Sequence, residues 1–110
     1  MRKLIAGNWK MHGDNAFARN LAKGIAQESD DIDHELLVCP PFVYIADVSE
    51  VLKDSPVVFG AQDCSAHKEG AHTGDISPSM LKDMGCSYVI LGHSELRQNH
   101  KESSDLIAEK

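Results

Sequence analysis

The amino-acid sequence predicts an α/β fold in which short parallel strands alternate with helices. Three observations lead to this prediction: four short apolar runs recur along the chain, amphipathic patterns follow them, and helix-capping residues mark the boundaries. Strict alternation of strand and helix favours parallel pairing, because parallel strands need a crossover connection. The predicted strands are Lys3 to Ala6, Leu36 to Cys39, Val57 to Gly60 and Tyr88 to Leu91.

The helices are predicted from apolar spacing and from their end signals. After the first strand, an i, i+3/i+4 pattern indicates an amphipathic helix, with Asp14 or Asn15 as its cap. This pattern comprises Phe17, Ala18, Leu21, Ala22 and Ile25. After Pro40 and Pro41, a second helix should end before Pro56, and one face of it should carry Ile45, Val48, Val51 and Leu52.

Two further helices are expected towards the end of the chain. A long polar loop follows the third strand, after which Ser77 as N-cap, Pro78 at the first helical position and Gly85 beyond the end delimit a short helix. A fourth helix should begin near Ser103 or Ser104. Its pattern is still running at Lys110, so we expect the sequence to be truncated there.

Two architectures satisfy this pattern, a doubly wound open sheet and a (β/α)8 barrel. Four strand-helix units would be half of such a barrel. An isolated half would leave two strand edges unpaired and much of the inward-facing apolar surface uncovered. We would therefore expect it to pair, aggregate or misfold on its own.

Composition restricts the class of protein and its partners. The 110 residues fit one domain, and 42% hydrophobic with 25% charged residues is typical of globular chains. A net charge of -6 and the lack of a basic stripe argue against nucleic acid as a partner.

The sequence shows neither an export signal nor an apolar run long enough to cross a membrane, so we expect a cytoplasmic protein that does not bind membranes. Cys39, Cys64 and Cys86 are widely spaced and should be reduced, packed thiols.

Polar residues at the ends of two strands are candidates for chemistry. In parallel α/β folds, functional side chains gather at the carboxyl ends of the strands. Asn8 and Lys10 follow the first strand, and they can point the same way if the extended conformation continues. A carboxamide beside a cation suits an anionic, oxygen-rich ligand, although an exposed loop with a salt-bridging lysine explains these residues equally well.

The fourth strand leads into Gly92, His93 and Ser94, and Ser94 is suited to cap a helix. The donor N–H groups of a helix start disfavour a protonated imidazole, so His93 should stay neutral and donate a hydrogen bond to a substrate carbonyl. A structural histidine whose nitrogens are satisfied locally is the more common situation for a lone residue of this type.

Five segments taken together resemble the triosephosphate isomerase family. They span nearly the whole chain. Together, at these separations, they identify the family more specifically than any one of them does alone. The segments are Ala6 to Met11 (AGNWKM), Cys39 to Pro41 (CPP), Gly60 to Asp63 (GAQD), Thr73 to Ser77 (TGDIS) and Leu81 to Glu95 (LKDMGCSYVILGHSE).

This resemblance implies the N-terminal half of a (β/α)8 TIM barrel, one incomplete domain over residues 1–110 that runs from the first strand to the start of the fourth helix. The family interconverts dihydroxyacetone phosphate and glyceraldehyde 3-phosphate through an enediolate, in glycolysis and gluconeogenesis, without metal or organic cofactor. By position, His93 would be the electrophile, Lys10 a catalytic and substrate-binding cation, Asn8 a substrate-binding residue, and Glu95 a partner of Lys10. Thr73 would lie at the interface of a homodimer.

Some expected features depart from the family or are missing. Leu96 stands where the family commonly has arginine, and His72 where it commonly has an aromatic residue, which affects the expected interface contacts. The general base, the closing lid and the glycine-rich phosphate loops of the family have no counterpart in residues 1–110, so the chain alone should be inactive. Glu102 and Glu109 are interpreted as solvated charges of the fourth helix.

Three other interpretations deserve comparison with this one. A metal site at Cys64, His67 and His72 is disfavoured, because their spacing fits no standard motif, and we expect no metal. A non-catalytic, self-associating half-barrel could bind anions through Lys10 and strand-end amides, but it leaves His93 without a role. A flavodoxin-like open sheet would fold alone, but it does not account for the five segments.

Overall fold

The computed structural model describes residues 2–110 and contains one parallel sheet with the strand order β1-β2-β3-β4. The strands are β1 (Leu4–Asn8), β2 (Glu35–Cys39), β3 (Val58–Ala61) and β4 (Tyr88–Val89). All three neighbouring pairs are parallel, with Leu4 opposite Glu35, Leu37 opposite Val58 and Gly60 opposite Tyr88. The predicted α/β class and parallel order are therefore confirmed, although β1 extends two residues further than expected and β4 is two residues shorter.

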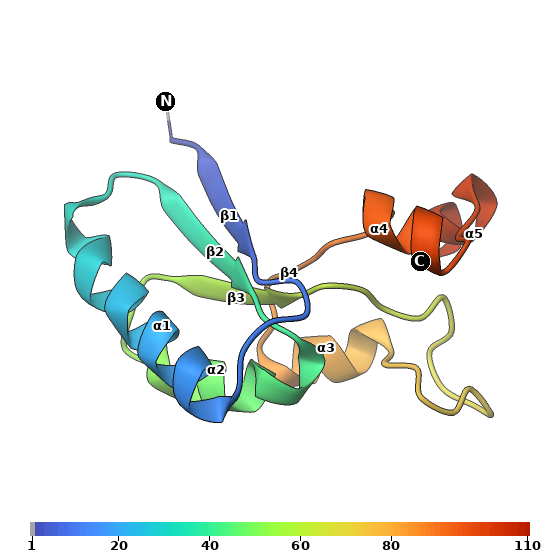
Figure 1. The fold of residues 1–110 in the computed structure, drawn as a ribbon, viewed down its shortest axis with the longest axis horizontal. Helices are drawn as coiled ribbons and strands as arrows, with labels where there is room; N and C mark the ends of the chain where they lie inside the picture. The colour runs from blue at the N-terminus through green and yellow to red at the C-terminus, as the bar shows by residue number, and fades with distance from the viewer. Residues whose placement is uncertain (1) are drawn as a thin grey trace.

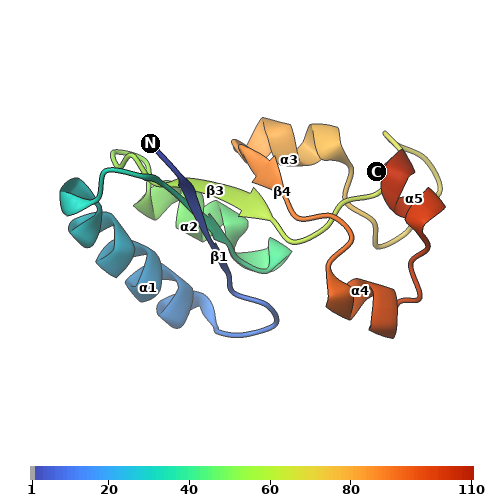
Figure 2. The ribbon, with the colours of Figure 1, turned by 90° about the horizontal axis from the view of Figure 1, so that it is seen from above.

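Helices follow each strand, as the sequence pattern predicts. They are α1 (Asn15–Glu28), α2 (Ile45–Val51), α3 (Pro78–Met84), α4 (Ser94–Asn99) and α5 (Ser104–Glu109), with short 3-10 turns at Ser29–Asp31 and Phe42–Tyr44. Figure 1 shows α1, α2 and α3 along one side of the sheet. Seen from above, α4 and α5 lie at the end of the molecule opposite α1 (Figure 2).

Most predicted helix ends are confirmed by their hydrogen bonds. The Asp14 carboxylate accepts from the N–H of Phe17 at 2.8 Å, so Asp14 rather than Asn15 caps α1. Ser77 caps α3 and Ser103 caps α5 in the same manner. Gly85 ends α3 with φ of 99°, a conformation that glycine adopts without steric cost.

Two apolar clusters join the helices to one face of the sheet. The first lies between α1, α2 and the sheet and contains Ala18, Ala22, Val38, Val48, Leu52 and Val57. The second joins α2, the end of β3 and α3 through Ile45, Ala61, Cys64 and Leu81. The helices therefore bury apolar residues of β2 and β3. Leu4 and Ile5 of β1, by contrast, are 45% and 48% exposed.

The sheet is curled, and within residues 2–110 each of its two outer strands has one edge without a pairing partner. β1 and β4 stand at the two ends of the strand order. The Tyr88 hydroxyl of β4 nevertheless donates to the Glu35 carboxylate of β2 at 3.1 Å, across the intervening β3. Four curled parallel strands with helices on one side form half of a (β/α)8 barrel. Of the two predicted architectures, the barrel therefore describes the structure better than the doubly wound open sheet.

A substitution at Gly60 tests the close approach of β3 and β4. A Cβ atom at Gly60 would lie 2.5 Å from the backbone oxygen of Tyr88, so Gly60→Ala must push the two strands apart. We expect the free energy of unfolding, measured by urea titration, to fall by about 1 to 3 kcal/mol.

Gly24→Ala in α1 is the matched control, because nothing lies within 4 Å of its Cβ position. That variant should be more stable by about 0.5 to 1 kcal/mol. Equal effects of the two changes would contradict the packing described here.

Candidate functional site

The carboxyl ends of the first three strands are tied together by the side chain of Gln62, which directly follows β3. Its Nε2 atom donates to the carbonyl oxygen of Lys10 at 2.8 Å and to that of Cys39 at 2.9 Å. The N–H of Trp9 donates to the same Cys39 carbonyl at 3.1 Å. Gln62 belongs to one of the family segments, but its role was not predictable from the sequence. Only the parallel register brings its amide to the two segments that follow β1 and β2.

Lys10 adopts a conformation that the sequence analysis did not expect. Its φ is 54°, in the left-handed region, so the extended conformation of β1 does not continue past Asn8. The Asn8 Oδ1 atom accepts from the Lys10 N–H at 2.9 Å and closes a local turn. The condition under which the two side chains were expected to point the same way is therefore not met, although both still line one pocket. With Oδ1 engaged in this turn, Asn8 can offer its NH2 group to a ligand.

His93 lies at the start of α4, a helix that the sequence analysis did not predict as a separate element. The residue itself is the N-cap, because its Nδ1 atom accepts from the N–H of Glu95 at 3.1 Å. The expectation that Ser94 would cap the helix is wrong, since Ser94 is the first helical residue. When Nδ1 acts as an acceptor in the neutral ring, the proton resides on Nε2. This tautomer leaves an N–H donor on the opposite side of the imidazole.

Glu95 connects the two strand ends. One of its carboxylate oxygens lies 3.5 Å from the Lys10 ammonium, and the other lies 3.4 Å from His93 Nδ1. The side chains of Lys10 and Glu95 are about half exposed, so their ion pair is screened by water and contributes little to stability. Its effect is to orient the lysine. The pairing with Glu95 expected from the family is present.

These side chains line one open pocket of about 460 Å³. Cation, imidazole and carboxamide groups therefore face a common space that can hold a small molecule. The cation can attract an anionic group, and the imidazole N–H and the carboxamide NH2 can donate to oxygen atoms. The pocket is lined by Asn8, Lys10, Met11, Phe42, Gln62, Asp63, His93, Glu95, Leu96, Asn99 and His100.

The loop between β3 and α3 projects from the sheet and carries Thr73 (Figure 1). Thr73 is exposed and does not line the pocket around His93. In the same loop the imidazoles of His67 and His72 stack at a centroid distance of 3.8 Å, so they contact each other through their faces. Within residues 2–110, no group of three or more potential ligands is placed to hold a metal ion.

The thiol of Cys39, the last residue of β2, is buried. Burial, with a smaller effect of the Cys86 thiol, raises the pKa of Cys39 to about 11, so this thiol is protonated near neutral pH.

The interpretation of Glu102 as a solvated helix charge is wrong. Glu102 precedes α5, only 8% of its side chain is exposed, and it pairs with Lys110 at 2.6 Å. Glu109 is exposed at the end of α5, as expected.

Comparison with known proteins supports the family resemblance. The family model described as triosephosphate isomerase matches residues 3–110. A triosephosphate isomerase of Nitrosococcus oceani is 48% identical over 108 residues, which are 97% of this chain and 43% of the relative. One from Gluconacetobacter diazotrophicus is 47% identical over 112 residues, covering 100% of this chain and 45% of the relative. The chain thus spans less than half the length of the curated relatives it matches.

The fold comparison gives the same result. A crystal structure of triosephosphate isomerase from Bartonella henselae superposes with a TM-score of 0.92 at 36% sequence identity. The match covers 100% of this chain and 46% of that protein. The curled four-stranded sheet is therefore similar to part of a complete barrel. In the described part of the chain, residues 2–110, no helix is long and apolar enough to cross a membrane.

The hydrogen bond that caps α4 predicts the tautomer of His93. If Nδ1 accepts from the Glu95 N–H, long-range ¹H–¹⁵N spectra at a pH where the ring is neutral should show the proton on Nε2. His100, which is exposed and follows the end of the same helix, serves as an internal reference in the same spectrum. A neutral His93 with its proton on Nδ1 would instead mean that the ring donates to the Glu95 carboxylate, and the geometry proposed for the site would be wrong.

Proposed function

Because this chain belongs to the triosephosphate isomerase family, we propose that it supplies the substrate-orienting and electrophilic half of a triose-phosphate isomerase site. The substrate pair is dihydroxyacetone phosphate and D-glyceraldehyde 3-phosphate, which are interconverted in glycolysis and gluconeogenesis. The proposal places the protein in the cytoplasm. The single observation that carries it is the convergence of Lys10 and His93 on one pocket, with His93 Nδ1 occupied as an acceptor.

The reaction moves a proton between adjacent carbons, and negative charge develops on the substrate oxygens. His93, with its proton on Nε2, donates a hydrogen bond to the substrate carbonyl and stabilises the enediolate oxygen as charge builds up. The Lys10 ammonium provides positive charge close to the same oxygens and to the phosphate. Glu95 holds that ammonium at 3.5 Å, and Asn8 orients the substrate through its NH2 group.

The carboxylates that line the pocket within residues 2–110 are those of Asp63 and Glu95, and both are engaged in ion pairs with lysines. Glu95 pairs with Lys10, and Glu102 is buried against Lys110. Glu109 lies on α5 and does not line the pocket. We therefore propose that the general base belongs to the portion of the relatives that this chain does not match. Residues 1–110 alone should show negligible turnover.

A chimeric protein tests this function. Residues 1–110 can be joined to the C-terminal portion of the Nitrosococcus oceani relative that the chain does not match, and assayed for isomerisation of dihydroxyacetone phosphate. We expect activity in the chimera, and His93→Gln should lower kcat by about 10² to 10³-fold, because one donor to the developing oxyanion is lost.

His100→Gln is the matched control, since this exposed imidazole lines the outer part of the same pocket and should change kcat little. An inactive but well-folded chimera that still binds inorganic phosphate would favour the non-catalytic, anion-binding alternative. Substantial isomerase activity of residues 1–110 alone, abolished by His93→Gln, would show that the proposed division of the site is wrong.

We also propose that the complete protein is a homodimer in which the projecting loop around Thr73 contacts the partner. The loop is polar, exposed and extended from the sheet, as an interface element would need to be. In the chimera, Thr73→Arg should shift the species measured by sedimentation from dimer to monomer. Asn20→Arg on the exposed face of α1 is the control and should leave the dimer intact. A dimer unaffected by Thr73→Arg would contradict the assignment.

A further inference from the structure

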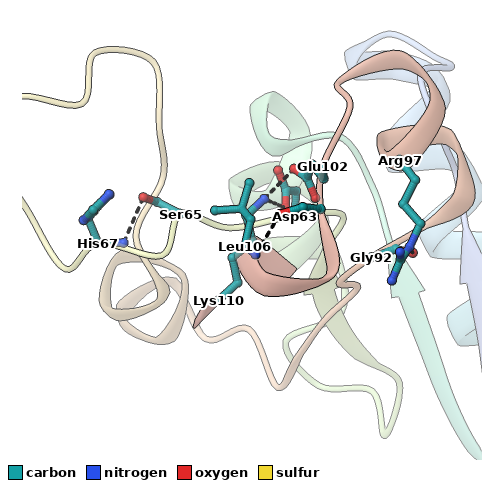
Figure 3. A network of polar contacts seen from close by, with 9 residues as sticks. Asp63, Ser65, His67, Gly92, Arg97, Glu102, Leu106 and Lys110 are labelled. Carbon is teal, nitrogen blue, oxygen red and sulfur yellow. Dashed lines mark hydrogen bonds and ion pairs between the residues drawn. The ribbon is translucent and has the colours of Figure 1, made fainter. Parts of the chain in front are cut away.

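A buried charge cluster lies beside the pocket and is not used by the proposed reaction. The Lys110 ammonium donates to Asp63 Oδ1 at 2.9 Å and to Glu102 Oε2 at 2.6 Å. Only 6% of the Lys110 side chain and 8% of the Glu102 side chain are exposed, against 28% for Asp63. Figure 3 shows the ammonium between the two carboxylates. Such charge-assisted hydrogen bonds are short and directional when water is excluded.

The cluster joins the segment after β3 to the residues that flank α5 on both sides. Asp63 lies two residues beyond the end of β3, Glu102 precedes α5, and Lys110 follows that helix. Two carboxylates share one ammonium, and among residues 2–110 the Glu102 Oε1 atom is buried without a hydrogen-bond partner. Removing the ammonium would leave the buried Glu102 carboxylate and the partly exposed Asp63 carboxylate without their shared counter-ion, so we expect the segment after β3 to move.

Asp63 is the immediate neighbour of Gln62, whose amide binds the carbonyls of Lys10 and Cys39. A lysine with φ of 54° keeps this conformation only where its surroundings hold it. Here the restraints are the Asn8 side chain on the Lys10 N–H and the Gln62 side chain on the Lys10 carbonyl. Any displacement of Asp63 would therefore loosen one of the two restraints on Lys10.

We propose that Lys110 is a positioning residue, which fixes the backbone of Lys10 through Asp63 and Gln62. Its functional meaning rests on the proposed role of Lys10 in the isomerase site, but the structural claim concerns the end of β1 alone. A purely global stabilising role would loosen all elements together. A positioning role predicts a selective loss of order at the end of β1.

Trp9 provides the readout, since it is the only tryptophan and stands directly before Lys10. The backbone N–H of Trp9 donates to the Cys39 carbonyl oxygen, which also accepts from the Gln62 amide. In Lys110→Met, we expect amide hydrogen exchange at Trp9 to accelerate about tenfold, with no change at Ala22, a buried residue of α1. The indole fluorescence of Trp9 should change at the same time.

Two variants serve as controls. Lys82→Met makes the same chemical change at an exposed site on α3 and should leave Trp9 exchange as in the parent chain. Asp63→Asn keeps an acceptor for Lys110 and removes one of the two clustered negative charges, so it should also preserve slow exchange at Trp9. If Lys110→Met does not fold, Lys110→Gln takes its place, because it also removes the ammonium, and the same selective acceleration is expected.

The proposal is overturned if a folded Lys110→Met chain, or its Lys110→Gln substitute, shows unchanged exchange at Trp9. Equal acceleration at Trp9 and Ala22 would overturn it as well, because this indicates only a general loss of stability. The exchange measurement needs no substrate. Its outcome is therefore independent of whether the chimera is active, and failure of the proposed function can be distinguished from failure of this inference.

Discussion

The pair of hydrogen bonds from Gln62 Nε2 to the carbonyls of Lys10 and Cys39 is the constraint on which the candidate site depends. Parallel pairing brings the ends of β1, β2 and β3 to one edge of the sheet, but it does not align the chain beyond them. The Gln62 side chain extends that alignment to the first residues after β1 and β2. The conformation of Lys10, and with it the direction of the ammonium, follows from this contact.

The second half of the site comes from the opposite edge of the sheet. β4 has only two residues, and the Tyr88 hydroxyl donates to the Glu35 carboxylate of β2. Beyond it, the Gly92 backbone has φ of 65° and turns the chain into α4, which starts at the His93 cap. Glu95 then reaches Lys10 from this helix. One ion pair thereby connects the first strand end to the last.

Local signals made most of the fold predictable from the sequence. Caps at Asp14, Ser77 and Ser103 and the left-handed Gly85 are determined by residues within a few positions, so the predictions for these helix ends were close. The cap of α4 was predicted wrongly because His93 uses its ring nitrogen where a hydroxyl is more usual. A six-residue helix is also too short to produce a clear apolar period.

Features set by contacts distant in sequence were not predictable. Glu102 resembles any exposed glutamate until Lys110 and Asp63 are brought beside it, the latter from 47 positions away along the chain from Lys110. In the same way, the left-handed Lys10 depends on an amide 52 residues further on. The residues Asn8, Lys10 and His93 were identified from their position at strand ends and from the family segments, whereas their orientation required the register of the sheet.

The four strands of this chain bring Lys10 and the start of α4 together at one end of the sheet. Nuclear Overhauser effects between the Lys10 and Glu95 side chains, in the isotopically labelled chimera, test this most directly. The structure predicts cross-peaks between these side chains in the folded chain, consistent with the 3.5 Å separation of the charged atoms. A folded chain with dispersed amide signals, but without any contact between Lys10 and Glu95, would contradict the account.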